Sequence, residues 1–309
     1  MQLLGLGEEV EELTREVRDL RSLVSSFREP FPPLNGSWGQ LVISRYRPVL
    51  NQGSADLPHP VDVFEWIETD VGTIVLPHFD RFILPELRER GSWEPQEAAL
   101  LRKAIEPGMT VIDVGANVGY SALVMSHAVG EDGQVIAFEP EPLNFDLLCA
   151  NIRHNRIANV LPIHSAVGNA TGSISLERSP DNSGDHRTAS HPWGIASLEV
   201  PLVALDDLVP AERRVHGIMV DAQGYDHRVI EGASRIIEHW RPFLVVEFWA
   251  PGIMAIGDDP DDVLRRYRSL GYRIQLLPND DVSELSADEI LRSAPPSGRD
   301  HTTLSLVPE

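Results

Sequence analysis

Two acidic residues, Asp221 and Glu247, end short apolar segments of the chain, 217–221 and 243–247. Segments of this kind are typical of buried strands, and neighbouring strands lie about 5 Å apart. Carboxylates at two such strand ends could share a proton or bind a hard divalent ion such as Mg²⁺. Both residues are therefore catalytic candidates and candidate metal ligands. The alternative is that each carboxylate caps a neighbouring loop or helix.

A second source of reactive side chains is the polar, turn-rich segment 180–187, PDNSGDHR. Its position between strand candidates is typical of a loop that covers a bound substrate. His186 is the candidate general base, because an imidazole has a pKa of about 6.5. A histidine in such a loop can also be a solvated side chain. Four polar residues are candidates for orienting the substrate: Asp185, Arg187, Gln223 and Tyr225.

A glycine-bearing turn, 114–121, follows the strand candidate 110–113 and precedes an apolar helix. In open α/β sheets, ligands bind outside the carboxyl ends of the strands, where such turns let the backbone approach them. The spacing G-x-N-x-G differs from the G-x-G-x-x-G of dinucleotide sites, so a dinucleotide is disfavoured. The turn can also serve strand-to-helix packing alone.

The next strand candidate, 134–138, is followed by Glu139 and Pro140. A carboxylate at this position can accept two hydrogen bonds from a ribose diol. Glu139 can also cap the helix that follows it.

Four sequence segments in fixed order resemble the FkbM type of S-adenosylmethionine-dependent methyltransferases. They are VIDVGANVGY (111–120), FEPEPLNFDLLCANIRHN (138–155), SAVGNATG (165–172) and MVDAQGYDHRVIEGA (219–233), and GSWEPQE (91–97) before them is similar too. The resemblance covers roughly residues 80–250. The fourth segment departs from the usual D-x-E-G, because Gln223 stands where a glutamate is usual.

The resemblance implies a class I, Rossmann-like methyltransferase with S-adenosyl-L-methionine as its cofactor. It implies that the turn surrounds the methionine part, that Glu139 binds the ribose hydroxyls and that 165–167 lies near the adenine. The expected cofactor-binding residues are Asp113, Gly115, Ala116, Asn117, Gly119, Tyr120, Ser121, Glu139, Pro140, Ser165, Ala166 and Val167.

The elements that must position these residues alternate between strand and helix from residue 93 onward. This alternation predicts an α/β fold with a doubly wound, mostly parallel sheet and helices on both faces. The expected helices are 94–105, one after Gly119, 144–155 and 228–239. The seven expected strands are 110–113, 134–138, 160–164, 217–221, 243–247, 273–276 and 303–307.

The chain before this domain has two parts. Apolar residues between 3 and 27 recur in steps of three and four, which predicts a coiled-coil helix over 1–30 and a homodimer or higher homo-oligomer. The alternative is an amphipathic helix that lies on its own domain. Residues 34–92 are expected to form a small β-rich extension, with strand-like pieces at 40–43, 61–68 and 72–76, and 93–309 to form the methyltransferase domain.

Composition limits the partners of the protein. The net charge of −21 repels phosphate backbones and anionic lipid surfaces, so neither nucleic acid nor a membrane is an expected partner. A single cysteine, Cys149, excludes an internal disulfide and a four-cysteine zinc site. The acidic N-terminus and the lack of a long apolar run lead us to expect a cytoplasmic protein.

These observations together predict an O-methyltransferase that acts on a hydroxyl group of a small molecule, a sugar or a polyketide-type natural product. The acceptor class rests on the resemblance alone. The alternatives are an N-methyltransferase of a small molecule and a catalytically inactive, cofactor-binding scaffold assembled through the N-terminal coil. A nicotinamide-dependent oxidoreductase is disfavoured by the spacing of the glycine turn.

Overall fold

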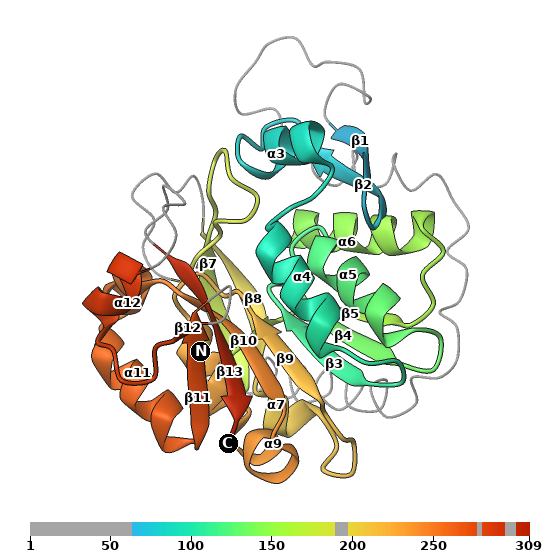
Figure 1. The fold of residues 1–309 in the computed structure, drawn as a ribbon. Coiled ribbons are helices and arrows are strands. Elements are labelled where there is room, and N and C mark those ends of the chain that lie inside the picture. The colour runs from blue at the N-terminus through green and yellow to red at the C-terminus, as the bar shows by residue number, and fades with distance from the viewer. Residues whose placement is uncertain (1–63, 189–196, 277–279, 294–300) are drawn as a thin grey trace, which may run out of the picture.

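The structure is a computed structural model that describes residues 64–188, 197–276, 280–293 and 301–309 (Figure 1). The predicted coiled coil at 3–27 and the strand-like piece at 40–43 lie outside the described residues, so the oligomeric state remains a prediction. None of the described helices is long and apolar enough to cross a membrane.

The centre of the fold is one sheet with the strand order β12-β11-β13-β10-β9-β3-β4-β5. Five adjacent strands are parallel, and β13 runs antiparallel to its two neighbours, β10 and β11. The predicted seven-stranded, doubly wound sheet is confirmed, and the two-residue strand β12 (Asp280–Asp281) extends its edge. The seven strands are β3 (Thr110–Val114), β4 (Gln134–Phe138), β5 (Val160–Ile163), β9 (Gly217–Val220), β10 (Phe243–Phe248), β11 (Tyr272–Leu276) and β13 (Thr302–Pro308).

Both faces of this sheet are buried, because alternate residues of each strand enter different cores. In β3, Ile112 and Val114 belong to one hydrophobic core and Val111 belongs to the other. One face is covered by α4 (Pro95–Ala104), α5 (Tyr120–Val129) and α6 (Pro142–His154), drawn in green shades in Figure 1. The other face is covered by α7 (Leu205–Leu208), α8 (Asp226–Glu231), α9 (Ser234–Trp240), α10 (Ala250–Ala255), α11 (Pro260–Ser269) and α12 (Ala287–Ser293).

The helix predicted over 228–239 is wrong as one element, because it divides into α8 and α9 at Gly232. A β-carbon on Gly232 would lie 1.9 Å from the carbonyl oxygen of Gly168, so two backbones meet there. Gly168 belongs to a region that the sequence did not predict, a three-stranded sheet ordered β6-β8-β7. Its strands are β6 (Ala166–Val167), β7 (Gly172–Glu177) and β8 (Ser197–Val203).

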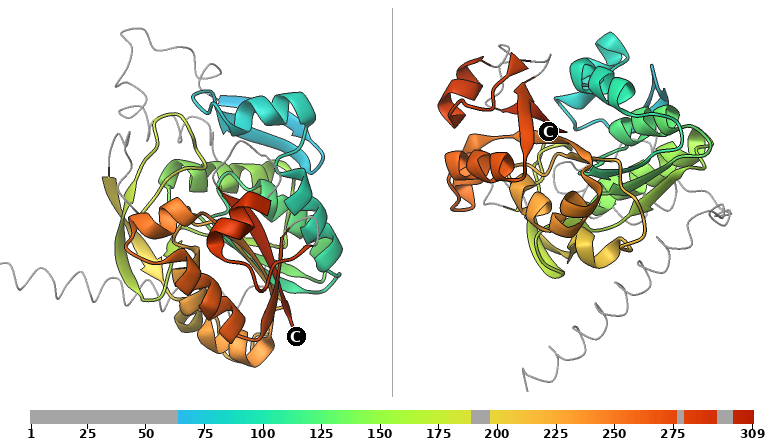
Figure 2. Two further views of the ribbon diagram at one scale, coloured as in Figure 1. Left: turned by 60° about the vertical axis from the view of Figure 1, so that its left-hand side comes forward. Right: turned by 60° about the horizontal axis from the view of Figure 1, so that its bottom comes forward.

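The described part of the N-terminal extension is a hairpin and a helix. Strands β1 (Phe64–Thr69) and β2 (Gly72–Pro77) pair antiparallel, and α3 (Ile83–Arg90) follows them. Asn151 of α6 holds the hairpin, because its side chain accepts a hydrogen bond from the N–H of Val75 and donates one to its carbonyl. Figure 2 shows the hairpin and α3 lying together beside the green helices.

Candidate active site

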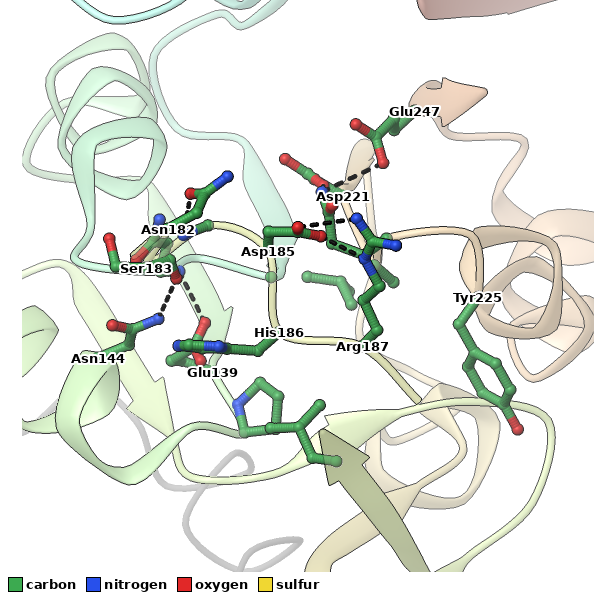
Figure 3. Close-up of a pocket in the computed structure, with 18 of the residues that line it drawn as sticks. Glu139, Asn144, Asn182, Ser183, Asp185, His186, Arg187, Asp221, Tyr225 and Glu247 are labelled. Carbon is green, nitrogen blue, oxygen red and sulfur yellow. Dashed lines mark hydrogen bonds and ion pairs between the residues drawn. The ribbon is translucent and has the colours of Figure 1, made fainter. Parts of the chain in front are cut away.

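A cavity of about 360 Å³ lies at the carboxyl ends of β3, β4, β9 and β10 (Figure 3). Its lining comes from these strand ends, from the start of α3 and from the loop 182–188. A smaller cavity of about 50 Å³ adjoins it. Six residues line both cavities and form the junction between them: Ile83, Trp93, Glu94, Gly115, Asn117 and Asp221.

The glycine turn is shaped by a close approach of two strand ends. Gly115 has φ +83°, and a β-carbon there would lie 1.9 Å from the carbonyl oxygen of Asp221. The N–H groups of Gly115 and Ala116 both donate to the carbonyl of Phe138. The turn is therefore fixed between β9 and β4, with the backbone of residues 115–117 at the cavity.

Two predicted cofactor-binding residues, Asp113 and Gly119, border neither of the two cavities formed by the described residues. Asp113 is buried behind the turn, where it accepts a hydrogen bond of 2.8 Å from the Ser121 hydroxyl, and burial raises its pKa to about 7. Gly119 has φ +100°, and a β-carbon there would lie 2.6 Å from the Leu148 side chain. Close packing against α6 therefore accounts for the glycine at this position. Three further predicted residues border the smaller cavity: Ala116, Tyr120 and Ser121.

Glu139 is 4% exposed and borders the larger cavity. Its two carboxylate oxygens accept hydrogen bonds of 2.8 Å from the N–H groups of Asn117 and Glu141. The cap of α6 is Glu141, which accepts from the N–H of Asn144, so Glu139 does not fill that position. Burial is the main reason that the pKa of Glu139 rises to about 8. The other predicted residues of this side also line the larger cavity: Pro140, Ser165, Ala166 and Val167.

The two predicted carboxylates, Asp221 and Glu247, are brought together with Gln223 between them. The Gln223 amide Nε2 donates to Asp221 Oδ1 at 2.7 Å and to Glu247 Oε2 at 3.3 Å. Burial, and then the charge of Asp221, raises the pKa of Glu247 well above its ordinary value. On the other oxygen of Glu247, His301 Nε2 lies 3.6 Å away.

This arrangement does not fit the predicted metal site. An amide N–H group, which a cation would repel, points at both carboxylates. Among the residues that the structure describes, no group of three or more His, Cys, Asp or Glu side chains is arranged to hold a metal ion. We therefore assign no metal to Asp221 and Glu247.

The loop with His186 borders the cavity as expected, but its geometry does not favour His186 as the base. His186 Nδ1 accepts a hydrogen bond of 3.0 Å from the N–H of Ser179. The neutral ring then carries its proton on Nε2, so neither nitrogen has a free lone pair for the proton of a substrate.

The predicted substrate residues all border the same cavity. The Arg187 guanidinium binds the Asp185 carboxylate (Figure 3). It also lies 4.2 Å from the ring centre of Trp249. Tyr225 also borders the cavity, and its ring packs near Gly168.

Sequence reasoning missed several residues that line this cavity, among them Glu94, Trp249 and His301. The segment GSWEPQE held a signal for Glu94, because the family resemblance includes this segment. No local signal marks His301. The antiparallel return of β13 beside β10 brings it near Glu247.

The strand order, with one antiparallel strand next to the last parallel one, and a cavity at the strand ends define a class I methyltransferase. The chain matches the methyltransferase FkbM domain over residues 113–274, just over half of its length. It therefore belongs to the FkbM methyltransferase family.

Individual relatives match only part of the chain, at modest identity. Methyltransferase sdnD of Sordaria araneosa is 25% identical over 175 residues, which are 46% of this chain and 66% of that protein. Protein-L-isoaspartate O-methyltransferase 2 of Arabidopsis thaliana is 30% identical over 119 residues, 38% of this chain and 36% of that protein. The chain thus spans just under two thirds of the first relative and about a third of the second.

Two solved structures are similar at a low level. Methyltransferase FkbM from Methylobacillus flagellatus KT has a TM-score of 0.42 and 15% identity, and the match covers 68% of this chain and 50% of that chain. Aeropyrum pernix fibrillarin, in complex with natively bound S-adenosyl-L-methionine, has a TM-score of 0.39 and 19% identity, with 69% and 74% covered.

Proposed function

We propose that this chain transfers a methyl group from S-adenosyl-L-methionine to a hydroxyl group of a small molecule, with a sugar or polyketide-type compound as the acceptor class. The observation that carries the proposal is that one cavity joins Glu139, at the end of β4, to the carboxylate pair at the ends of β9 and β10. A nucleoside and a second reactant can then meet over the glycine turn. The acceptor class is inferred from the family resemblance.

The residues present fit this cofactor. Both oxygens of Glu139 retain a lone pair after accepting their backbone hydrogen bonds, which suits two ribose hydroxyls. The buried Oδ1 of Asn117, at the cavity, accepts no hydrogen bond from the residues that the structure describes. When bound, the cofactor supplies an electrophilic methyl group on a positively charged sulfur.

We assign the acceptor proton to the pair Asp221 and Glu247 in place of His186. A hydroxyl group that attacks a methyl carbon must lose its proton to a base within hydrogen-bond distance. A carboxyl whose pKa is raised, such as that of Glu247, is a stronger base than an ordinary carboxylate. The Gln223 amide holds both carboxylates in place and reduces their mutual repulsion.

The acceptor itself must be held in line with the methyl group, because positioning contributes most of the rate in such a displacement. Trp249 and Thr188 border the cavity, and each has a buried polar atom, Nε1 and Oγ1, without a hydrogen-bond partner among the described residues. Both atoms can bind oxygen atoms of a polyhydroxylated acceptor.

The proposal is tested in two stages with the full-length protein. Calorimetric titration with S-adenosylhomocysteine measures cofactor binding. Incubation with S-adenosylmethionine and a panel of glycosides and polyketide alcohols, read by mass spectrometry, measures methyl transfer. No binding at millimolar concentration would exclude the proposed cofactor.

The carboxylate pair is tested with Asp221→Asn and Glu247→Gln. Each substitution is expected to lower kcat about 100-fold or more, and each should change S-adenosylhomocysteine affinity less than threefold. Binding without transfer to any acceptor would favour the cofactor-binding scaffold. Methylation of amine acceptors alone would favour the N-methyltransferase.

A further inference from the structure

The chain turns sharply after Asp221, and this turn, residues 222–224, has a strained backbone. Gln223 has φ 50°, in the left-handed region that residues with a β-carbon seldom adopt, and Gly224 has φ +89°. Strain of this kind persists only where the surrounding structure fixes it. The groups that contact the turn must therefore supply the constraint.

Asp226 holds the turn on both sides of Gln223. Its side chain is 2% exposed. Oδ1 accepts a hydrogen bond of 2.9 Å from the N–H of Ala222, and Oδ2 accepts one of 3.0 Å from the N–H of Gly224. One buried carboxylate thus fixes the backbone directly before and directly after Gln223.

Helix α10 also contacts the turn. A β-carbon on Gly224 would lie 2.7 Å from the backbone of Gly252 in that helix, so the turn packs against α10 with no room for a side chain. This packing and the two hydrogen bonds to Asp226 together determine where residue 223 lies.

The position of residue 223 decides whether its amide can reach two carboxylates. Each of the two N–H groups on Gln223 Nε2 has one partner, Asp221 Oδ1 at 2.7 Å and Glu247 Oε2 at 3.3 Å. The second distance is just beyond the usual range of an N–H···O hydrogen bond. A small displacement of the turn is therefore enough to separate Gln223 from Glu247.

The position of Asp226 in its own helix does not explain its carboxylate. It is the first residue of α8, but its side-chain hydrogen bonds lead back to the turn that precedes the helix. Burial of a carboxylate is costly, and a helix start is capped as well by asparagine or serine. Asp226 also lies close to the pair, because burial and then the charges of Asp221 and Asp226 raise the pKa of Glu247.

We propose that Asp226 is a positioning residue for the methyl transfer. By fixing the turn, it keeps the Gln223 amide between Asp221 and Glu247, the pair to which we assign the acceptor proton. The inference rests on the proposed function. It gives a role in the reaction to a buried residue that borders neither of the two cavities formed by the described residues.

The test is a double-mutant cycle between Asp226 and Gln223 in the full-length protein. Asp226→Asn keeps the shape of the side chain but offers one acceptor oxygen, so one N–H of the turn loses its partner. Gln223→Met keeps the length of the side chain and removes the amide. A residue that acts through Gln223 has little further effect once the amide is gone, whereas an independent structural residue has the same effect in both backgrounds.

The first readout is kcat with S-adenosylmethionine and the glycoside or polyketide alcohol of the panel that is methylated fastest. Asp226→Asn is expected to lower kcat about tenfold or more in the unmodified protein, and less than about threefold in the Gln223→Met background. The affinity for S-adenosylhomocysteine, measured by calorimetry, should change less than about threefold in both backgrounds.

Asp206→Asn is the matched control. The two carboxylate oxygens of Asp206 also accept from two backbone N–H groups, those of Arg235 and Ile236 in α9, and Asp206 borders neither cavity. The control removes the same kind of contact away from the carboxylate pair. It should change kcat less than about twofold in either background.

The second readout, thermal melting at pH 8, needs no acceptor. Asp226→Asn should lower the melting temperature by at least about 2 °C less in the Gln223→Met background than in the unmodified protein. If Asp226→Asn does not fold, Asp226→Ser takes its place, because a hydroxyl needs less space and reaches one N–H of the turn at most.

Equal effects of the Asp226 variant in the two backgrounds, on kcat or on melting, would overturn the inference. So would a loss of kcat that is matched by Asp206→Asn. If the unmodified protein binds no S-adenosylhomocysteine or methylates no acceptor, the proposed function itself fails. The melting cycle then still decides whether Asp226 acts through Gln223.

Discussion

The buried carboxylate of Asp80 accepts two hydrogen bonds from Ser183, one from its backbone N–H at 2.8 Å and one from its hydroxyl at 2.5 Å. The other oxygen of Asp80 accepts from three N–H groups at the start of α3. The carbonyl of Ser183 also accepts from Asn144 of α6. One buried side chain therefore joins the helix after the N-terminal hairpin to the loop that borders the cavity.

Asp80→Asn is expected to loosen this loop. An amide cannot accept from both the Ser183 groups and the helix N–H groups, so the free energy of unfolding should fall by about 1–3 kcal/mol. Hydrogen exchange of residues 180–187 should become faster, as measured by mass spectrometry. Asp181→Asn is the control, because it removes only an ion pair to Arg81 at 3.8 Å between exposed side chains. Equal protection in both variants would contradict the role of Asp80.

Gly115→Ala is expected to cost about 3 kcal/mol or more of stability and to abolish S-adenosylhomocysteine binding. The added methyl group would collide with the backbone of Asp221, in addition to the cost of positive φ. Gly108→Ala is the matched control, since Gly108 has φ +85° and open space around its β-position. It should cost only about 1 kcal/mol. Urea denaturation of both variants measures the difference, and similar losses would show that backbone strain alone explains Gly115.

Glu139 makes the fold less stable as the pH rises. Its carboxyl has an ordinary pKa of 4.5 and a pKa of about 8 in the fold, so between these values the folded state holds a proton that the unfolded state has lost. The free energy of unfolding therefore decreases as the pH rises through this window. A glutamine at position 139 does not titrate, so Glu139→Gln should not show this decrease. The melting temperature of Glu139→Gln relative to the unmodified protein should rise by at least about 3 °C between pH 5 and pH 8.

Glu139→Gln should also weaken S-adenosylhomocysteine binding, because an amide offers one acceptor oxygen where the carboxylate offers two.

A difference in melting temperature between Glu139→Gln and the unmodified protein that is constant with pH would show that Glu139 titrates at its ordinary value. Asp146→Asn, on the neighbouring helix α6, is the control for the change of charge.

Gln223→Glu restores the D-x-E-G pattern that is usual for the family, and here it is expected to destabilise the protein. An ionised glutamate cannot donate to Asp221 or Glu247, and it adds a third negative charge to a buried pair. The loss should be about 2 kcal/mol at pH 8 and smaller at pH 6, where carboxyls of raised pKa are protonated. Thermal melting at the two pH values measures it, with the exposed Gln96→Glu as the control. An unchanged midpoint at pH 8 would contradict the bridging role of the Gln223 amide.

The central α/β pattern could be predicted because its signals are local. In β3, α5, β4 and α6, strand and helix periodicity and the glycine turn agree with the observed elements to within a few residues. The helix over 228–239 failed, since its division at Gly232 depends on contact with Gly168, which is distant in the sequence. The sheet of β6, β7 and β8 was missed for a similar reason, because β6 has two residues and β7 and β8 pair across the long connection 178–196.

The candidate site also contains residues that the sequence predicts and residues that only the tertiary structure places. Acidic residues at the carboxyl ends of strands, such as Glu139, Asp221 and Glu247, can be identified from the sequence, because parallel strands bring these ends to one edge of the sheet. The tertiary structure alone decided that Asp113 borders neither cavity, that the Gln223 amide bridges two carboxylates and that Glu94 and His301 border the same cavity as those carboxylates. The physical reason is that side-chain direction, burial and hydrogen-bond partners depend on which distant segments pack together, and no local pattern of residues carries that information.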